Sequence, residues 1–304
     1  MSFNLLSILG PTASGKTSLA AHIASRLDSV VISADSRQVY RGMDIGTGKD
    51  LNDYYVNGTQ VPYYLINVCE AGEKYNLYEY QKDFREVFHQ HSGQNKIPVL
   101  CGGSGLYIEA VLKDYNLLSV PVNQILRKEL SNKSDDKLIK LLSSYKKLHN
   151  TTDTITRKRL IRAIEIEKFQ QENLVNQTHF SEINSLIIGI KYEREEQKKR
   201  ITERLKSRLE NGMVEEIEQL LKKGLTSEDL IYYGLEYRFV TQYLMGQLSY
   251  EEMFNLLNIA IHQFSKRQMT WFRKMERAGF QIHWLDGNLP IEEKVEIVME
   301  LLKV

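Results

Sequence analysis

The sequence predicts an α/β fold with a parallel-sheet core, an inserted all-helical domain and a helical C-terminal half. Short apolar segments alternate with helix-length segments early in the chain, which is typical of a parallel sheet covered by helices. The middle of the chain is instead charged, poor in Gly and patterned at helical spacing. A Gly-rich motif near the N-terminus joins the first apolar segment to the first helical one.

Four apolar segments are the candidate strands of the core. Three of them come early, and each is closed by Gly or Asp. The fourth comes much later and is expected to join the same sheet. The segments are "NLLSILG" (4–10), "SVVISAD" (29–35), "IPVLCGG" (97–103) and "SLIIGI" (185–190).

The helical segments define two predicted domains. Helices are expected at 17–27 and 77–91, and again from Arg194 almost to the end. In that last region a buried face is marked by Ile201, Leu205 and Leu209, which recur every four residues. The predicted domains are a catalytic core, residues 1–118 plus 185–304, and a helical insertion, residues 119–184.

The composition excludes several classes of protein. The chain has 304 residues and a formal charge of +1, from 40 Lys and Arg against 39 Asp and Glu, so any basic surface must be local. Two cysteines without paired spacing argue against a disulfide framework or a cysteine-based zinc site. No apolar run approaches the ~18 residues of a membrane helix. We therefore expect a cytoplasmic protein.

The motif "GPTASGKT" satisfies the pattern G-x-x-x-x-G-K-[ST] of a phosphate-binding loop. Its glycines let backbone N–H groups converge on phosphate oxygens at a helix N-terminus, Lys16 adds a cation, and the Thr17 hydroxyl is a ligand for Mg²⁺. A chance Gly/Ser turn is the alternative, but the strand before and the helix after favour phosphate binding. The core is therefore expected to be P-loop NTPase-like, with the phosphate-binding residues Gly10, Pro11, Thr12, Ala13, Ser14, Gly15, Lys16 and Thr17.

The carboxylate that usually accompanies such a loop is missing from the expected strand. "IPVLC" is followed by "GGSG", with no acid to hold Mg²⁺. The only comparable carboxylate is Asp35, which ends the segment 29–35 and is placed to act on an acceptor substrate, as in small-molecule kinases. The alternative is that Asp35 caps the next turn, since Asp followed by Ser is typical of turns.

Five stretches resemble one family, the tRNA dimethylallyltransferases, which prenylate adenosine next to the anticodon. They are "GPTASGKTSLA", "ISADSRQVYRGMDIGTGK", "PVLCGGSGLYIEAVL", "RLIRAIEI" and "KRQMTWFRK". The resemblance covers most of the chain, and "DSRQVYRGMDIGT" is far more specific than the phosphate loop. It implies transfer of a dimethylallyl group from dimethylallyl diphosphate to N6 of adenosine 37 in the anticodon loop, with diphosphate as the leaving group and Mg²⁺ as cofactor.

The resemblance also implies roles for individual residues. Asp35 becomes the general base that takes the N6 proton, and Ser104 orients the purine. Lys16 and Arg204 stabilise the diphosphate, with Arg200 in reserve. From the residues alone, Ser104 is equally a helix cap and Arg204 equally part of a solvated charged face, and Arg208 is expected to belong to such a face.

Two basic segments are the candidate contacts with RNA. One is "RKRLIR" (157–162) in the insertion, and the other is "KRQMTWFRK" (266–274). Charge runs of this kind are usually solvated helix faces, and Trp271 and Phe272 are more often core residues. The resemblance nonetheless places both segments against the anticodon stem-loop of tRNA and implies a monomer without a membrane partner. The residues it implies as tRNA-binding are Asp35, Ser36, Arg37, Gln38, Ser104, Arg127, Lys158, Arg159, Leu160, Ile161, Arg162, Tyr237, Arg238, Arg267, Gln268, Thr270, Trp271 and Arg273.

The chain departs from the family pattern at three positions. In "YYGLEYR", Glu236 stands where many members have Gly, and Tyr233 stands where they have Arg. Lys158 replaces a usual Gln. We expect none of these changes to touch the diphosphate site.

Two other functions remain compatible with the sequence. A small-molecule or nucleoside kinase would use the same loop for ATP and Asp35 as base on a hydroxyl acceptor. An RNA-binding switch would use nucleotide only to order the fold. The segment "KRQMTWFRK" argues against a kinase, which has no need of it.

Overall fold

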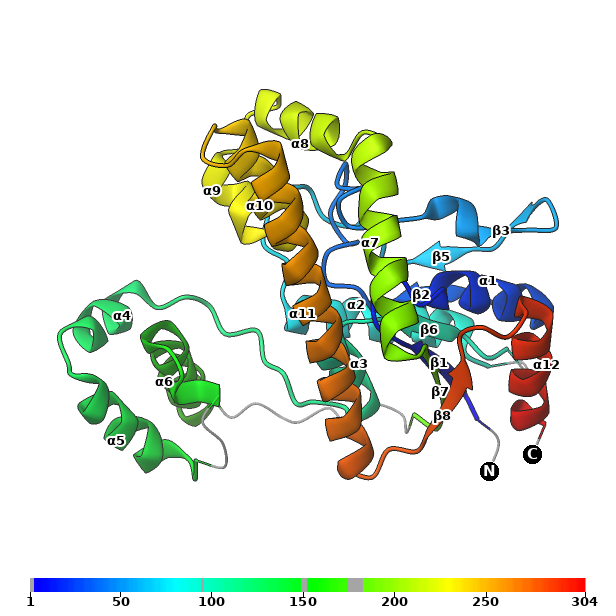
Figure 1. Cartoon of the computed structure of the whole chain (residues 1–304). Helices are drawn as coiled ribbons and strands as arrows, with labels where there is room; N and C mark the ends of the chain where they lie inside the picture. Colours follow the sequence, from blue (N-terminus) through cyan, green and yellow to red (C-terminus); the bar gives the residue numbers. More distant parts are fainter. Residues whose placement is uncertain (1–2, 94–95, 149–151, 174–182, 304) are drawn as a thin grey trace. The chain divides into compact units, whose positions relative to one another are not determined.

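The computed structural model describes residues 3–93, 96–148, 152–173 and 183–303 (Figure 1). Its contacts divide the chain into two compact units, Met1–Asp114 with Ser181–Val304, and Tyr115–Phe180. Each unit has a hydrophobic core of its own.

The larger unit is built on a parallel sheet. Within the described residues, six strands pair in the order β5-β2-β6-β1-β7-β8, all of them parallel. The four predicted strands are confirmed as β1 (Leu5–Leu9), β2 (Val31–Ser33), β6 (Val99–Gly102) and β7 (Ser185–Lys191). Parallel strands end at one edge, so the segments after β1, β2 and β6 meet there.

The sequence did not predict three further features of this sheet and its surroundings. β8 (Ile282–Asp286) pairs with β7 in a region expected to be helical, because one short strand between Gly279 and Gly287 interrupts the helical pattern only briefly. β5 (Tyr63–Tyr64) and the hairpin of β3 (Tyr55–Val56) and β4 (Thr59–Gln60) are only two residues long per strand, which is too short for a periodic signal.

Helices cover the sheet and build the C-terminal half. The predicted hydrophobic stripe in the helix after Arg194 is confirmed, since Ile201, Leu205 and Leu209 are buried. No helix in the described ranges combines the length and the apolar character that a membrane span needs. The helices of this unit are α1 (Lys16–Arg26), α2 (Leu77–His91), α3 (Gly105–Leu112), α7 (Arg194–Glu210), α8 (Met213–Lys222), α9 (Ser227–Tyr232), α10 (Leu235–Leu244), α11 (Tyr250–Arg277), α12 (Ile291–Leu302) and the 3₁₀ turn η1 (Leu51–Tyr54).

The smaller unit is helical. It contains α4 (Gln124–Ser131), α5 (Asp135–Tyr145), the 3₁₀ turn η2 (Thr152–Thr154) and α6 (Arg157–Glu172). These helices share a small apolar core, which needs a polar supplement because so few side chains are buried in it. The core residues are Leu126, Leu130, Leu138, Leu142, Leu160, Ala163 and Ile164.

Glu165 supplies that supplement. Its side chain is only 1% exposed and pairs with both Arg127, at 2.8 Å, and Arg162. It also accepts the backbone N–H of Asn123 at 2.6 Å. Burial by itself raises the pKa of Glu165, but the hydrogen bonds from Arg127, Arg162 and Asn123 outweigh it and leave the pKa below its ordinary value.

This network changes the interpretation of three residues implied to contact tRNA. Leu160 is buried in the core of the smaller unit, so its side chain is not available to RNA. Arg127 and Arg162 hold Glu165 and keep about a third of their side chains exposed. Lys158 and Arg159, in contrast, lie exposed on α6, and Ile161 is half-buried against the core.

Replacing Glu165→Gln should destabilise the smaller unit, because it leaves two arginines around a buried site without their counter-charge. We expect a loss toward the lower end of the ~3–5 kcal/mol typical of broken buried pairs, since both arginines are partly exposed. Amide hydrogen exchange should accelerate in α4, α5 and α6 while the sheet keeps its protection.

The matched control is Glu172→Gln on the same helix, where the side chain is 61% exposed and 3.8 Å from Lys168. Because the folded pKa of Glu165 is depressed, its contribution is complete above its ordinary pKa of 4.5 and is lost as the pH falls through the lower folded value. Equal exchange rates in the two variants would contradict this role.

Candidate active site

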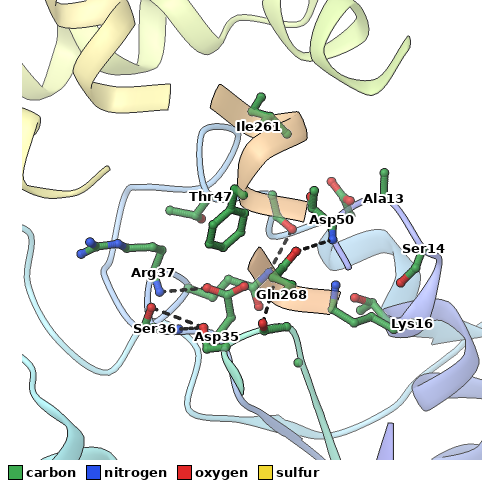
Figure 2. Close-up of a pocket in the computed structure, with 18 of the residues that line it drawn as sticks. Ala13, Ser14, Lys16, Asp35, Ser36, Arg37, Thr47, Asp50, Ile261 and Gln268 are labelled. Carbon is green, nitrogen blue, oxygen red and sulfur yellow. Dashed lines mark hydrogen bonds between the residues drawn. The ribbon is translucent and has the colours of Figure 1, made fainter. Parts of the chain in front are cut away.

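A cavity of about 840 Å³ lies in the larger unit, where the loops after β1, β2 and β6 meet. Helices α7, α10 and α11 contribute further walls. Figure 2 shows Lys16, Asp35 and Asp50 around it. The cavity therefore brings the predicted phosphate loop and the predicted base into one space.

The phosphate loop has the conformation that its sequence predicts. Gly15 has φ +77°, a left-handed conformation that suits Gly, and α1 begins at the next residue without a side-chain cap. The N–H groups of its first turn are therefore available to an anion. Residues 12–17 line the cavity, whereas Gly10 and Pro11 do not.

Lys16 and Thr17 lie at the start of α1. The Lys16 ammonium donates to the carbonyl of Pro11 at 3.3 Å, and burial lowers its pKa, with the charges of Arg204 and Arg208 acting in the same direction. The Thr17 side chain hydrogen-bonds to Cys101. Both residues line the cavity.

Helix α7 holds the outer side of the phosphate loop. Gln197 donates to the carbonyl of Thr12 at 2.8 Å, and Arg200 Nε donates to the carbonyl of Ala13 at 3.1 Å. The guanidinium of Arg200 also stacks on Tyr192, with 4.4 Å from Cζ to the ring centre. Arg200 thus fixes the loop, and Arg204, one turn further, reaches the cavity.

Gln268 on α11 holds the inner side of the same loop. Its Oε1 accepts the N–H of Thr12 at 2.9 Å, and its Nε2 donates to the carbonyl of Gly103 at 2.9 Å. The side chain is buried, and its amide is spent on these two loops. Gln268 also lines the cavity, so it positions the two loops, and its implied contact with tRNA stays a prediction.

Asp35 and Ser104 meet through Ser36. Asp35 Oδ1 accepts the N–H of Arg37 at 2.9 Å, so Asp35 does cap the turn, and it also lines the cavity. Ser104 makes no side-chain cap to α3; its Oγ instead accepts the N–H of Ser36 at 3.1 Å. This approach requires Gly102, since a Cβ there would lie 2.2 Å from the Ala34 carbonyl oxygen.

The loop 44–48 forms another wall and is held by Glu216. Its carboxylate accepts the N–H groups of Asp44, Ile45 and Gly46 at 2.8, 2.7 and 3.0 Å, and the Tyr237 hydroxyl at 2.8 Å. Tyr237, implied to contact tRNA, is thus buried beneath this loop. No local pattern indicates the role of Glu216, because its backbone partners lie about 170 residues away in the chain.

Gln38 and Asp50 complete this wall. The Gln38 amide accepts from Ser33 Oγ at 3.2 Å and donates to the Gly48 carbonyl at 3.0 Å, so it too holds protein groups. Asp50 is paired with Arg204. The pKa of Asp53 is raised by burial and then by the nearby charge of Asp50.

Arg208 contradicts the prediction of a solvated face. Its side chain is only 13% exposed and lines the cavity beside Arg204. Burial, and then repulsion by Arg204, lowers the pKa of Arg208 to about 10. Its spacing from Arg204 placed it on the correct side of α7, but periodicity alone does not tell a cavity from solvent.

The remaining implied tRNA contacts separate into two groups. Arg37, Arg267 and Trp271 line the cavity, and Trp271 packs so closely on α3 that a Cβ at Gly105 would lie 2.4 Å from its Cδ1. Phe272 is a core residue. Exposed residues that do not line the cavity are Arg238, Thr270 and Arg273.

Comparisons with known proteins show the family of the chain. A family model described as IPP transferase matches residues 38–275. A tRNA dimethylallyltransferase 1 of Parabacteroides distasonis is 57% identical over 301 residues, 99% of this chain and 98% of that protein. A tRNA dimethylallyltransferase 1 of Geotalea uraniireducens is 50% identical over 300 residues, 98% of each chain.

Solved structures share the fold. The tRNA isopentenylpyrophosphate transferase of Bacillus halodurans superposes with a TM-score of 0.72 at 29% identity, covering 99% of this chain and 95% of that one. A eukaryotic dimethylallyltransferase acting on tRNA gives a TM-score of 0.79 at 19% identity, covering 99% of this chain and 80% of that one, which shows the fold alone. The chain belongs to the IPP transferase family, the family of the tRNA dimethylallyltransferases.

Proposed function

We propose that this protein transfers a dimethylallyl group from dimethylallyl diphosphate to N6 of the adenosine next to the anticodon of tRNA, and releases diphosphate. The observation that carries the proposal is the shared cavity, in which the phosphate loop, Asp35 and Ser104 all take part. One end of this space suits a diphosphate and the other suits a base.

The diphosphate is bound at the start of α1. The N–H groups of residues 13–17, the Lys16 ammonium and the Arg204 guanidinium surround it. As the allylic carbon–oxygen bond breaks, negative charge grows on the departing oxygen, and these fixed donors stabilise it. The phosphate loop therefore holds a leaving group, and no phosphoryl group is transferred.

Asp35 takes the proton that N6 loses when the carbon–nitrogen bond forms. Oδ1 accepts the N–H of Arg37, which fixes the carboxylate at the end of β2. Ser104, tied to the same turn through the N–H of Ser36, orients the purine. The new bond and the proton transfer leave a neutral secondary amine and diphosphate.

Mg²⁺ fits the donors present. Among the described residues no group of three or more His, Cys, Asp or Glu side chains is arranged to hold a metal ion by itself. The Thr17 hydroxyl therefore serves as one oxygen ligand beside the substrate's phosphate oxygens, an arrangement typical of Mg²⁺. The ion supplies further charge stabilisation to the leaving diphosphate.

RNA is held by exposed cationic and aromatic side chains. Arg37, Phe264 and Arg267 line the cavity, and the Arg267 guanidinium lies 5.8 Å from the Phe264 ring centre. The anticodon-loop base is extruded to reach Asp35, and such rings and guanidinium planes stack on unpaired bases. On the smaller unit, Lys158 and Arg159 add contacts with the RNA backbone.

The proposed reaction is tested with unmodified tRNA, Mg²⁺ and dimethylallyl diphosphate, read by mass spectrometry of the digested RNA. We expect one added prenyl group on a single anticodon-loop adenosine. A parallel reaction with ATP and nucleoside acceptors tests the kinase alternative. ADP formation there, without a prenyl adduct, would overturn the proposal.

Asp35→Asn should abolish most of the chemistry and little of the binding. The amide oxygen still accepts the N–H of Arg37, so the turn is kept while the base is lost. We expect the single-turnover rate to fall ~10²- to 10⁴-fold, with the Kd for an anticodon stem-loop changed by less than ~2-fold. Asp28→Asn is the matched control, because Asp28 is 94% exposed. A loss of RNA affinity as large as the loss of rate would assign Asp35 to binding.

Thr17→Ala should raise the Mg²⁺ concentration needed for half-maximal rate by ~10-fold or more, while Thr17→Ser should remain close to the unchanged protein. Only the first substitution removes the hydroxyl. The measurement is a Mg²⁺ titration of the initial rate at saturating substrates. The same Mg²⁺ concentration for half-maximal rate in all three proteins would exclude Thr17 as a metal ligand.

A further inference from the structure

Arg208 is buried in the cavity wall without a hydrogen bond. Its Nε and Nη2 are buried and have no hydrogen-bond partner among the described residues. The Asp50 carboxylate lies 3.9 Å from Nη2, beyond hydrogen-bond distance. A buried charged donor without a partner is costly, so a protein keeps one only where something else satisfies it.

Other arginines of the chain show what a structural guanidinium looks like. Arg157, for example, binds Asp135 and donates to the carbonyls of Leu130, Ser131 and Lys133. Arg127 gives two hydrogen bonds to Glu165. Arg208 makes none of this kind, although it is more deeply buried than either.

Arg208 also points toward the other cations of the cavity. A Cβ built at Gly48 would lie 1.7 Å from Arg208 Nη2 and 2.9 Å from Arg204 Nη2, so both guanidinium groups reach the same spot beneath the loop 44–48. The charges of both arginines are close enough to lower the pKa of Lys16. Three cations therefore converge on one part of the cavity, and a polyvalent anion relieves their repulsion.

Glu236 lies near Arg208 and opposes the lowering of its pKa. It also lines the cavity, and its charge favours the protonated guanidinium. No hydrogen bond between the two is present in the described part of the chain, so the guanidinium keeps its donors free. The pair balances charge while leaving the fork of Arg208 open to a ligand.

We propose that Arg208 binds the diphosphate of the prenyl donor, together with Lys16 and Arg204. The identity of the donor rests on the proposed function, whereas the binding of diphosphate does not. Arg204 and Arg208 are one helical turn apart, ~5.4 Å along α7, and their side chains converge. Arg208 then stabilises the leaving group directly, as a third cation beside the phosphate loop.

The test is calorimetric titration of inorganic diphosphate into the full-length protein, in the presence and absence of Mg²⁺. Arg208→Met removes the charge and the donors, and we expect the Kd to rise ~10- to 100-fold. Lys206→Met is the matched control on the same helix, because Lys206 is exposed and does not line the cavity. Its Kd should stay within ~2-fold of the unchanged protein.

Two further measurements separate ligand binding from structural support. Arg208→Met also removes the cation near Glu236, so the Tm of each ligand-free variant serves as its own reference. The rise in Tm caused by diphosphate should be smaller for Arg208→Met than for the unchanged protein. The Kd for an anticodon stem-loop, read by fluorescence anisotropy, should not change. Arg208→Gln is read by the same criteria if Arg208→Met fails to fold.

Unchanged diphosphate affinity in a folded variant overturns the inference. So does a loss of RNA affinity alone, which would make Arg208 a contact with RNA phosphates. Failure of the proposed function gives a different result: the unchanged protein would bind diphosphate, with Arg208 contributing, but would form no prenylated adenosine.

Discussion

Gln268 joins the two loops between which the proposed chemistry takes place. Its amide accepts from Thr12 in the phosphate loop and donates to Gly103 after β6. Both bonds come from one buried side chain on α11, so the distance between the two loops is fixed by a rigid group. If this bridge were lost, the donors for the diphosphate and the groups that hold the base would no longer keep their relative position.

Helix α7 repeats this principle from the other side. Gln197 and Arg200 hold carbonyls of the phosphate loop, and the two arginines that follow extend from the same helix into the cavity. The N-terminal strand–loop–helix supplies the backbone donors, and the C-terminal helices supply the side-chain cations. The cavity is therefore lined by residues of the N-terminal segment and of the C-terminal half together.

The sequence predicted those parts of the fold and site that have a local signal. Each of these parts is recognisable from a few neighbouring residues: the four buried strands from short apolar runs, the phosphate loop from its motif, and α7 from its apolar stripe. β8 was not predicted, because a five-residue strand between two helices barely interrupts the helical pattern. The role of Glu216 was not predicted, because it depends on partners that are distant in the chain.

Residues of the family motifs also hold the cavity walls in place. Gln38, Tyr237 and Gln268 stand in segments that resemble the family, yet their polar groups bind other parts of the protein. A motif residue can contact the substrate, or it can position another residue that contacts the substrate. The motif alone does not distinguish these two roles, whereas the three-dimensional contacts of the side chain do.

Arg208 and Glu236 show the converse case, in which a departure from the pattern has a physical partner. Glu236 stands where many family members have Gly, and a buried carboxylate in that place is unfavourable without a nearby cation. Burial raises the pKa of Glu236, and the charge of Arg208 opposes that rise. The opposite charges of Arg208 and Glu236 cancel in the net charge of the cavity. The pair still differs from two neutral side chains, because Arg208 keeps Nε and Nη2 without a hydrogen-bond partner among the described residues.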